Sequence, residues 1–162
     1  MLLHNQTQAI QRMNTLAKEG KDFFFIINYR ADSAYIEEFT NIDPRELLFS
    51  FPTLSNIPEA ESYSSEAVEW HTEPPTREDY EHRINLVKQR EREGDSYLAN
   101  LTCKIPIRTN LSLHDIFMRS KALYRCWMKE KFVCFSPEIF VRINREGLIS
   151  SFPMKGTIDA TR

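Results

Sequence analysis

The chain has 162 residues, with 21 lysine and arginine against 23 aspartate and glutamate side chains, for a formal net charge of -2. This length allows one domain with a sizeable core, and the small negative charge argues against a nucleic-acid or membrane-surface role because no large basic field exists. No apolar run is long enough to span a bilayer, and the first residues lack the basic-then-apolar pattern of a signal peptide.

Helix signals occur in three places. Residues 5–19 have apolar side chains at helical spacing. Residues 76–79 combine an N-cap threonine with an acid three positions later, and the helix they begin is expected to run to Gly94. Residues 112–115 repeat that start signal. The expected inward residues of the first helix are Ile10, Met13, Leu16 and Ala17, and those of the third are Ile116, Phe117, Leu123, Tyr124 and Trp127.

Strands are expected between the helices. The aromatic and β-branched run at residues 23–27 predicts a central strand covered on both faces. Residues 132–135, 139–143 and 148–152 predict three strands in close succession, a meander. Shorter strands are expected at residues 35–39, 47–51, 67–72 and 97–107. Helices that alternate with mostly antiparallel strands predict an α+β fold, and no linker marks a second domain.

The cysteines and histidines argue against a disulfide framework and a zinc site. Cys103, Cys126 and Cys134 form no C-x-x-C pair, and one thiol stays unpaired under any disulfide scheme. Reduced thiols in a cytosolic core are therefore expected, and with them a soluble, cytoplasmic protein. The H-x-E at residues 71–73 lacks the P-C-x-x-C of zinc deaminases, and the other histidines have no spaced ligand partners. We expect no metal ligands in this chain.

Lys155 is the candidate catalytic residue. The apolar run at residues 148–152 predicts a buried strand, so that Lys155 would emerge at its end with little water around it. Desolvation favours the neutral amine, which acts as a nucleophile or base. Gly156 adds no side chain and lets a substrate approach the backbone, and Thr157 offers a hydroxyl group. Taken alone, K-G-T is a weak signal because most lysines are solvated.

The order of three motifs gives Lys155 more weight. Residues 94–102 read G-D-S-Y-L-A-N-L-T, residues 135–140 read F-S-P-E-I-F, and residues 153–157 read P-M-K-G-T. Together they resemble the chorismate-binding enzymes, which include anthranilate synthase, component I of aminodeoxychorismate synthase, isochorismate synthase and salicylate synthase. The resemblance covers residues 80–162 and implies a fold of mostly antiparallel sheet layers flanked by helices.

Two positions distinguish the activities within that family. Isochorismate and salicylate synthases carry a lysine base where this chain has Leu98, which cannot take a proton. Anthranilate synthases have alanine in place of Lys155, whereas aminodeoxychorismate synthases have lysine. The chain therefore resembles component I of aminodeoxychorismate synthase, of the shorter type whose motif reads P-M-K-G-T-I-D-A. Anthranilate synthase component I is the alternative, and a non-catalytic binding or assembly module is the rival outside the enzyme class.

The resemblance implies amination of chorismate to 4-amino-4-deoxychorismate for para-aminobenzoate and folate synthesis. Lys155 would be the covalent nucleophile, and Gly156 and Thr157 would line the substrate pocket. The implied cofactor is Mg²⁺, which would bridge the ring carboxylate. Ammonia would come from a glutamine amidotransferase subunit or from solution.

Length is the main departure from the family pattern, because family members are longer and their magnesium ligands lie downstream of the lysine motif. We therefore expect residues 1–162 to be the N-terminal portion of a single chorismate-binding domain, cut just after P-M-K-G-T. The magnesium ligands are then expected downstream of Arg162, and the fragment alone should be inactive. Uncovered strand edges and apolar faces make self-association of the fragment an expected property.

Overall fold

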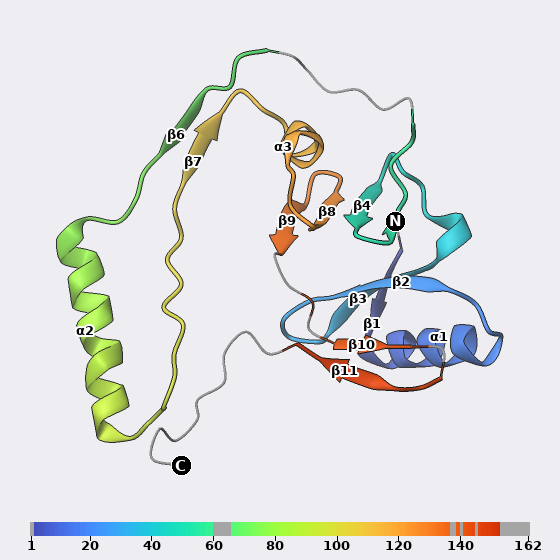
Figure 1. Cartoon of the computed structure of the whole chain (residues 1–162), viewed down its shortest axis with the longest axis horizontal. Coiled ribbons are helices and arrows are strands. Elements are labelled where there is room, and N and C mark those ends of the chain that lie inside the picture. Colours follow the sequence, from blue (N-terminus) through green and yellow to red (C-terminus); the bar gives the residue numbers. More distant parts are fainter. Residues whose placement is uncertain (1, 60–65, 137–138, 140, 145, 153–162) are drawn as a thin grey trace. The chain divides into compact units, whose positions relative to one another are not determined.

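The computed structural model describes residues 2–59, 66–136, 139, 141–144 and 146–152, and its elements are labelled in Figure 1. The chain divides into two compact units: unit 1 comprises Met1–Tyr63 and Leu113–Arg162, and unit 2 comprises Ser64–Ser112. All strand pairs among the described residues are antiparallel, and helices accompany them. The fold class is α+β, as the sequence predicts.

The described residues of unit 1 form two larger sheets, a separate two-stranded hairpin and two α-helices. The first sheet has the order β1-β3-β2, from Leu3–Asn5 (β1), Ser33–Glu38 (β3) and Phe23–Ile27 (β2). The second has the order β5-β4-β8-β9, from Leu54–Ser55 (β5), Leu47–Phe51 (β4), Tyr124–Met128 (β8) and Phe132–Ser136 (β9). The helices are Gln6–Lys18 (α1) and Leu113–Arg119 (α3), and a 3-10 turn spans Phe39–Asn41.

The helices and the two larger sheets of unit 1 form layers, because alternate side chains of each strand pack against different neighbours. In β3, Ala34 and Ile36 pack against α1, whereas Tyr35 between them faces the core shared with the second sheet. In β4, Leu48 faces α3, whereas Leu47 and Phe49 face the shared core. Successive side chains of a strand point to opposite faces, so both sheets are apolar on both sides. The layer order is therefore α1, first sheet, second sheet, α3.

Helix α1 confirms the predicted first helix. The side chain of Asn5 accepts a hydrogen bond from the Gln8 backbone at 2.9 Å, and the Gln8 side chain accepts from the Asn5 backbone at 3.1 Å, a capping box. The predicted inward face is only partly right, since Leu16 is buried but Ile10 is 56% exposed. Ala9 is buried in its place, because positions 9 and 16 lie two turns apart on one stripe.

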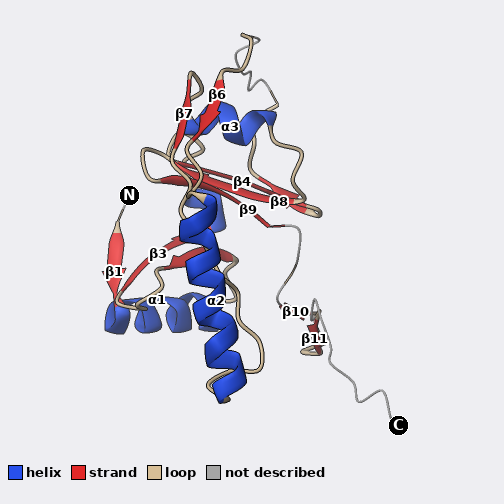
Figure 2. Cartoon of the chain, turned by 90° about the vertical axis from the view of Figure 1, so that its left-hand side faces the viewer, coloured by secondary structure: helices blue, strands red, loops and turns tan. Residues whose placement is uncertain are grey.

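Unit 2 consists of Trp70–Thr72 (β6), Arg77–Glu93 (α2) and Ile107–Thr109 (β7), with β6 paired to β7 (Figure 2). The Thr76 side chain accepts a hydrogen bond from the Asp79 backbone at 3.1 Å, and Gly94 ends the helix at φ 85°. Both ends of the second predicted helix are thereby confirmed. A left-handed residue at the helix end is readily supplied by glycine, which has no Cβ to clash.

Two strand predictions are wrong in their details. The run at residues 23–27 forms β2, but β2 is an edge strand of the described sheet, and Phe25 is 50% exposed. The central position belongs to β3, whose Ala34 and Ile36 are small or β-branched enough to pack under α1. Of the strand predicted at residues 97–107, only Ile107 lies in a strand, and Leu98 is 76% exposed.

The third helix and the meander also differ from expectation. Helix α3 ends at Arg119, and Tyr124 and Trp127 lie in β8 instead. Their apolar spacing fits a helix, but Trp127 packs on α3 from the sheet, and Leu123 is 62% exposed. Strand β9 pairs only with β8 in the described chain, and Val141–Ile143 (β10) pairs with Ile149–Ser151 (β11) as a separate hairpin.

Candidate functional site

The predicted catalytic group falls where the structure gives no placement. Lys155, Gly156 and Thr157 lie outside the described residues, so their roles stay predictions. The hairpin that leads to them is described up to Phe152. In it, Ile149 of β11 is 65% exposed, so the expected buried strand before Lys155 is wrong for the described residues. Two paired strands alone leave at least one face open to water, which explains the exposure.

The other two motifs of the sequence resemblance lie in different units. Gly94 ends α2, and the residues that follow it up to 106 form no helix or strand. Phe135 and Ser136 end strand β9, and residues 137, 138 and 140 lie outside the described residues. The described parts of these two motifs therefore lie at the end of α2 in unit 2 and at the end of β9 in unit 1, and the juxtaposition of the three motifs stays a prediction.

An apolar pocket of about 250 Å³ lies between the two sheets of unit 1. The rings of Phe51 and Phe24 stack with their centroids 6.2 Å apart. The centroid of the Tyr124 ring lies 5.7 Å from that of Phe51. Arg125 and Ser136 add polar groups to the lining. The remaining wall residues are Ile26, Cys126, Phe132, Cys134 and Phe135. Apolar walls with a few polar groups are typical of a site for a small molecule.

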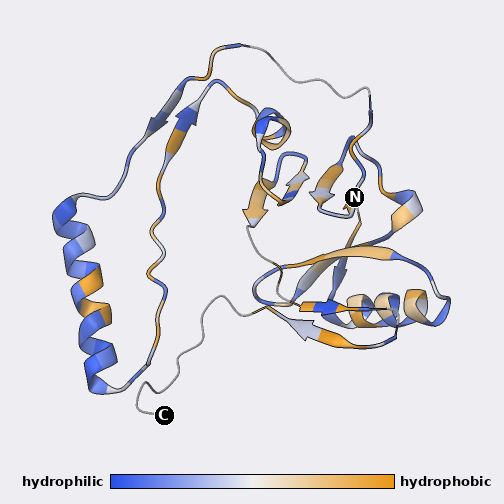
Figure 3. Ribbon diagram, in the orientation of Figure 1, coloured by the Kyte–Doolittle hydropathy of each residue, from blue (hydrophilic) through white to orange (hydrophobic). Residues whose placement is uncertain are grey.

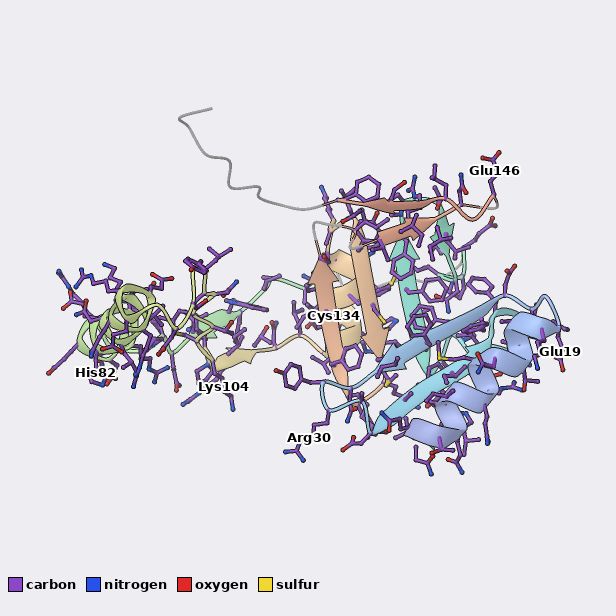
Figure 4. The ribbon with its side chains drawn as sticks, turned by 90° about the horizontal axis from the view of Figure 1, so that it is seen from below. Glu19, Arg30, His82, Lys104, Cys134 and Glu146 are labelled. Carbon is purple, nitrogen blue, oxygen red and sulfur yellow. The ribbon has the colours of Figure 1, made fainter. Side chains whose placement is uncertain are left out.

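The thiols in this pocket are unsuited to nucleophilic chemistry. Burial, with the neighbouring Cys134, raises the pKa of Cys126 from 9.0 to about 12. Burial also raises the pKa of Cys134, which pairs directly with Cys126 across β8 and β9 and is labelled in Figure 4. Since the thiolate is the reactive form, both groups are protonated and inert near neutral pH.

Sequence reasoning missed this pocket, although a signal for it exists. Strand pairing is not readable from the chain, so Phe24 and Phe51 could not be assigned to facing sheets. Once residues 23–27 and 124–128 are taken as strands, the two-residue repeat of strand geometry does indicate which side chains of each strand share a face.

Metal-binding and membrane-spanning features are absent from the part of the chain that the structure describes. No group of three or more histidine, cysteine, aspartate or glutamate side chains could hold a metal ion there. The described residues thus do not fit a magnesium site. Among the same residues, no helix is long and apolar enough to cross a membrane.

Comparison with known proteins shows to which family the chain belongs. The model of the chorismate binding enzyme family matches residues 12–162, nearly the whole chain. The chain belongs to the chorismate-binding enzyme family. This confirms the resemblance drawn from the three motifs and extends it into the first half of the chain, as far as residue 12 within α1.

Two curated relatives of this family member are uncharacterised PabA-like proteins. The one from Pasteurella multocida is 34% identical over 152 residues, which cover 94% of this chain and 47% of the relative. The one from Haemophilus influenzae is 34% identical over 152 residues, with coverage of 94% and 45%. The chain thus spans about half the length of these relatives. No solved structure matches it.

Proposed function

We propose that this chorismate-binding chain is part of component I of an aminodeoxychorismate synthase, which aminates chorismate to 4-amino-4-deoxychorismate for para-aminobenzoate and folate synthesis. The observation that carries the proposal is Lys155 within P-M-K-G-T, inside the segment that matches the family. The PabA-like names of both relatives support the para-aminobenzoate branch. Three free thiols, Cys103, Cys126 and Cys134, fit a reducing cytoplasm.

In the proposed reaction, the neutral amine of Lys155 bonds to C2 of the chorismate ring. The ring double bonds shift, the bond from C4 to its hydroxyl breaks, and the hydroxyl leaves as water with a proton from the amine. Ammonia then bonds to C4, the double bonds shift back, and the bond between C2 and Lys155 breaks. A proton from the incoming ammonia leaves with the lysine amine, so chorismate and ammonia yield 4-amino-4-deoxychorismate and water.

Gly156 and Thr157 have positioning roles in this proposal. Without a Cβ, Gly156 leaves room for the ring beside the backbone, and the hydroxyl of Thr157 donates to a substrate oxygen. Magnesium, when bound, would supply Lewis-acid stabilisation of the substrate carboxylate, with ligands outside the described residues. The proposed nitrogen source is free ammonia or a glutamine amidotransferase subunit.

The test uses the protein that carries this chain, incubated with chorismate, ammonium and magnesium. Lys155→Ala should abolish the covalent adduct seen by mass spectrometry and lower turnover by about 100-fold or more, the effect expected for a group that acts on the reacting atoms. Lys104→Ala removes an exposed lysine from unit 2 and should change neither. An undiminished adduct in Lys155→Ala would refute the nucleophile role.

The product identifies the branch of the family. NMR should show 4-amino-4-deoxychorismate. Formation of anthranilate, which is detected by its fluorescence, would favour anthranilate synthase component I instead. Absence of turnover with both ammonium and glutamine plus an amidotransferase would favour a non-catalytic binding or assembly module.

A further inference from the structure

Two cysteines of unit 1 face each other across neighbouring strands. Cys126 of β8 is the register partner of Cys134 of β9, so the two residues lie directly opposite each other in an antiparallel pair. Side chains of directly opposite residues project from the same face of a sheet. On this face Cys126 belongs to the core that contains Tyr35 and Phe49, and both cysteines line the pocket of about 250 Å³. The two thiols are also hydrogen-bonded to each other.

The backbone geometry of such a pair suits a disulfide. Directly opposite residues of an antiparallel pair have Cα atoms about 4.5 or 5.5 Å apart, according to their place in the hydrogen-bond pattern. Disulfides join residues whose Cα atoms are about 4.4–6.8 Å apart. The Cβ atoms are about 4.5–5.5 Å apart in opposite pairs and about 3.5–4.5 Å apart in disulfides. The bond therefore needs only a small approach of the two residues, and a bond that needs such an adjustment is easily reduced again.

The two thiols differ in their access to solvent. Cys126 is buried, at 7% exposure, whereas Cys134 is exposed. Figure 3 shows β9 as a mainly apolar strand, and among the described residues no further strand pairs with its other edge. A dissolved oxidant therefore reaches Cys134 first, and Cys126 lies behind it to complete the bond.

We propose that Cys126 and Cys134 are a reversible redox pair, which glutathione disulfide and other small disulfides oxidise to a cross-strand disulfide. The bond joins β9 to β8 immediately before the F-S-P-E-I-F motif at residues 135–140. This modification goes beyond the proposed amination, because it requires no chemistry at Lys155.

The oxidation consists of two exchange steps. The thiolate of Cys134 attacks one sulfur of glutathione disulfide, the bond between the two glutathione sulfurs breaks, and one glutathione leaves and takes up a proton. The thiolate of Cys126 then attacks Sγ of Cys134, and the second glutathione leaves in the same way. Two cysteine thiols are oxidised, and one glutathione disulfide is reduced to two glutathione thiols.

The raised pKa values of the two thiols affect the rate of this reaction rather than its outcome. Because almost all of each thiol is protonated at neutral pH, the first attack is slow. The second attack is helped because Cys126 is already held beside Cys134. The same two groups are thus unsuited to rapid catalysis and suited to a slow modification under sustained oxidation.

The experiment treats the protein that carries this chain with glutathione disulfide at a pH of about 8.5, where more of each thiol is ionised, until the reaction stops. Remaining thiols are alkylated in urea before digestion with trypsin. Cleavage after Arg125, Lys129 and Lys131 puts the cysteines in separate peptides, residues 126–129 and 132–142. We expect mass spectrometry to show these two peptides joined by a disulfide, and dithiothreitol to separate them. Lys155→Ala should give the same joined peptides, which distinguishes this proposal from the proposed reaction.

Single variants test the roles of the two thiols. Cys126→Ala leaves Cys134 without its partner, so the chain should retain one glutathione as a mixed disulfide at Cys134. Cys134→Ser removes the accessible thiol, and Cys126 should then react with glutathione disulfide about tenfold more slowly or less, because burial limits attack. Cys103→Ser is the control, since it removes the third cysteine and should leave the joined peptides unchanged. Near-ultraviolet circular dichroism checks that each variant is folded.

Two results with the unsubstituted protein would overturn the proposal. The first is recovery of residues 126–129 and 132–142 only as separate peptides, alkylated or carrying glutathione, after prolonged oxidation. The second is a disulfide that joins either cysteine to Cys103 or to a second molecule in place of the bond between β8 and β9.

Discussion

The guanidinium carbon of Arg125 lies 5.1 Å from the centre of the Phe117 ring, and its Nη1 donates to the backbone carbonyl of Phe117 at 3.1 Å. The same nitrogen also donates to the carbonyl of Ser120. One side chain of β8 thus satisfies carbonyls at the end of α3 and covers its fully buried aromatic residue. These contacts of Arg125 hold the end of α3 on the outer face of the second sheet.

Arg125→Met should therefore destabilise unit 1 by about 2–3 kcal/mol, because methionine keeps the length of the side chain but loses the charged hydrogen bonds. Urea unfolding followed by near-ultraviolet circular dichroism measures the change. Arg45→Met is the control, since Arg45 pairs with Asp43 at 2.8 Å on the surface with its side chain 86% exposed. Equal midpoints for the two variants would contradict the role given to Arg125.

Asn56 holds the backbone of β4 in the way that a neighbouring strand would. Its Nδ2 donates to the Leu47 carbonyl at 2.8 Å, and its Oδ1 accepts from the Phe49 amide at 2.8 Å. Asn56→Ala should cost about 2 kcal/mol, because two partly buried backbone groups lose their partner. Asn14→Ala, at an exposed position of α1, should have no comparable effect. A thermal midpoint unchanged by Asn56→Ala would refute this account.

Local signals allowed the helices of this fold to be predicted, whereas strand partners could not be. The capping residues Asn5, Thr76 and Gly94 act within one turn of chain, and α1 and α2 begin and end where they indicate. Trp127 has helical spacing to Leu123 and Tyr124 in sequence, yet it reaches α3 from a strand. Side-chain spacing is compatible with both arrangements, and only tertiary packing decides between them.

The exposure of individual side chains was harder to predict from the sequence than the secondary structure. Ile149 and Leu98 are apolar and lie in segments that the sequence favoured as strands, but both are largely exposed. An apolar residue indicates a preference for burial and does not identify what buries it. The same holds for the candidate site: chemistry and motif order single out Lys155 in the sequence, whereas neither of them specifies which groups surround its amine.

Among the described residues, Ala31 and Glu130 adopt a positive φ without being glycine. Ala31 has φ 54° and Glu130 has φ 55°, in the turns before β3 and before β9. A Cβ strains this conformation by roughly 1–2 kcal/mol, and glycine removes the strain at an entropic cost of roughly 0.5–1 kcal/mol. Ala31→Gly and Glu130→Gly should thus be neutral or stabilise by up to about 1 kcal/mol, as measured by urea unfolding.

Valine at the same position gives the contrasting test. Ala31→Val should destabilise by about 1 kcal/mol or more, because a β-branched side chain is poorly tolerated at positive φ. Destabilisation by Ala31→Gly greater than that by Ala31→Val would be incompatible with backbone strain at this turn.

The free energy of unfolding should fall at alkaline pH because the pKa of Tyr35 is raised in the folded chain. Burial, together with the carboxylates of Glu37, Asp43 and Glu46, raises the pKa of Tyr35 from 10.0 to about 12. Between these two values the unfolded chain has released a proton that the folded chain retains, so unfolding becomes easier as the pH rises. Tyr35→Phe should make this loss shallower, and Tyr97→Phe, at a fully exposed side chain, should not. Identical slopes for both variants above pH 10 would exclude Tyr35 as the cause.

Because of the ion pair between Lys21 and Glu38, the free energy of unfolding should also fall as the pH is lowered in the acid range. Lys21 Nζ lies 3.0 Å from Glu38 Oε1, and this hydrogen bond holds the pKa of Glu38 below 4.5 while it raises the pKa of Lys21 above 10.5. A lowered carboxyl pKa contributes stability that is present above 4.5 and is lost as the pH falls through the folded value.

Glu38→Gln should therefore lower the stability at neutral pH and have a diminishing effect as the pH falls below 4.5, where the wild-type carboxylate is itself protonated. Lys21→Met should give the same pattern, and the double variant should add little to either single change, because both remove one interaction. Urea midpoints at a series of pH values measure this. An effect of Glu38→Gln that is independent of pH would assign the contribution of Glu38 to packing at the end of β3 rather than to its charge.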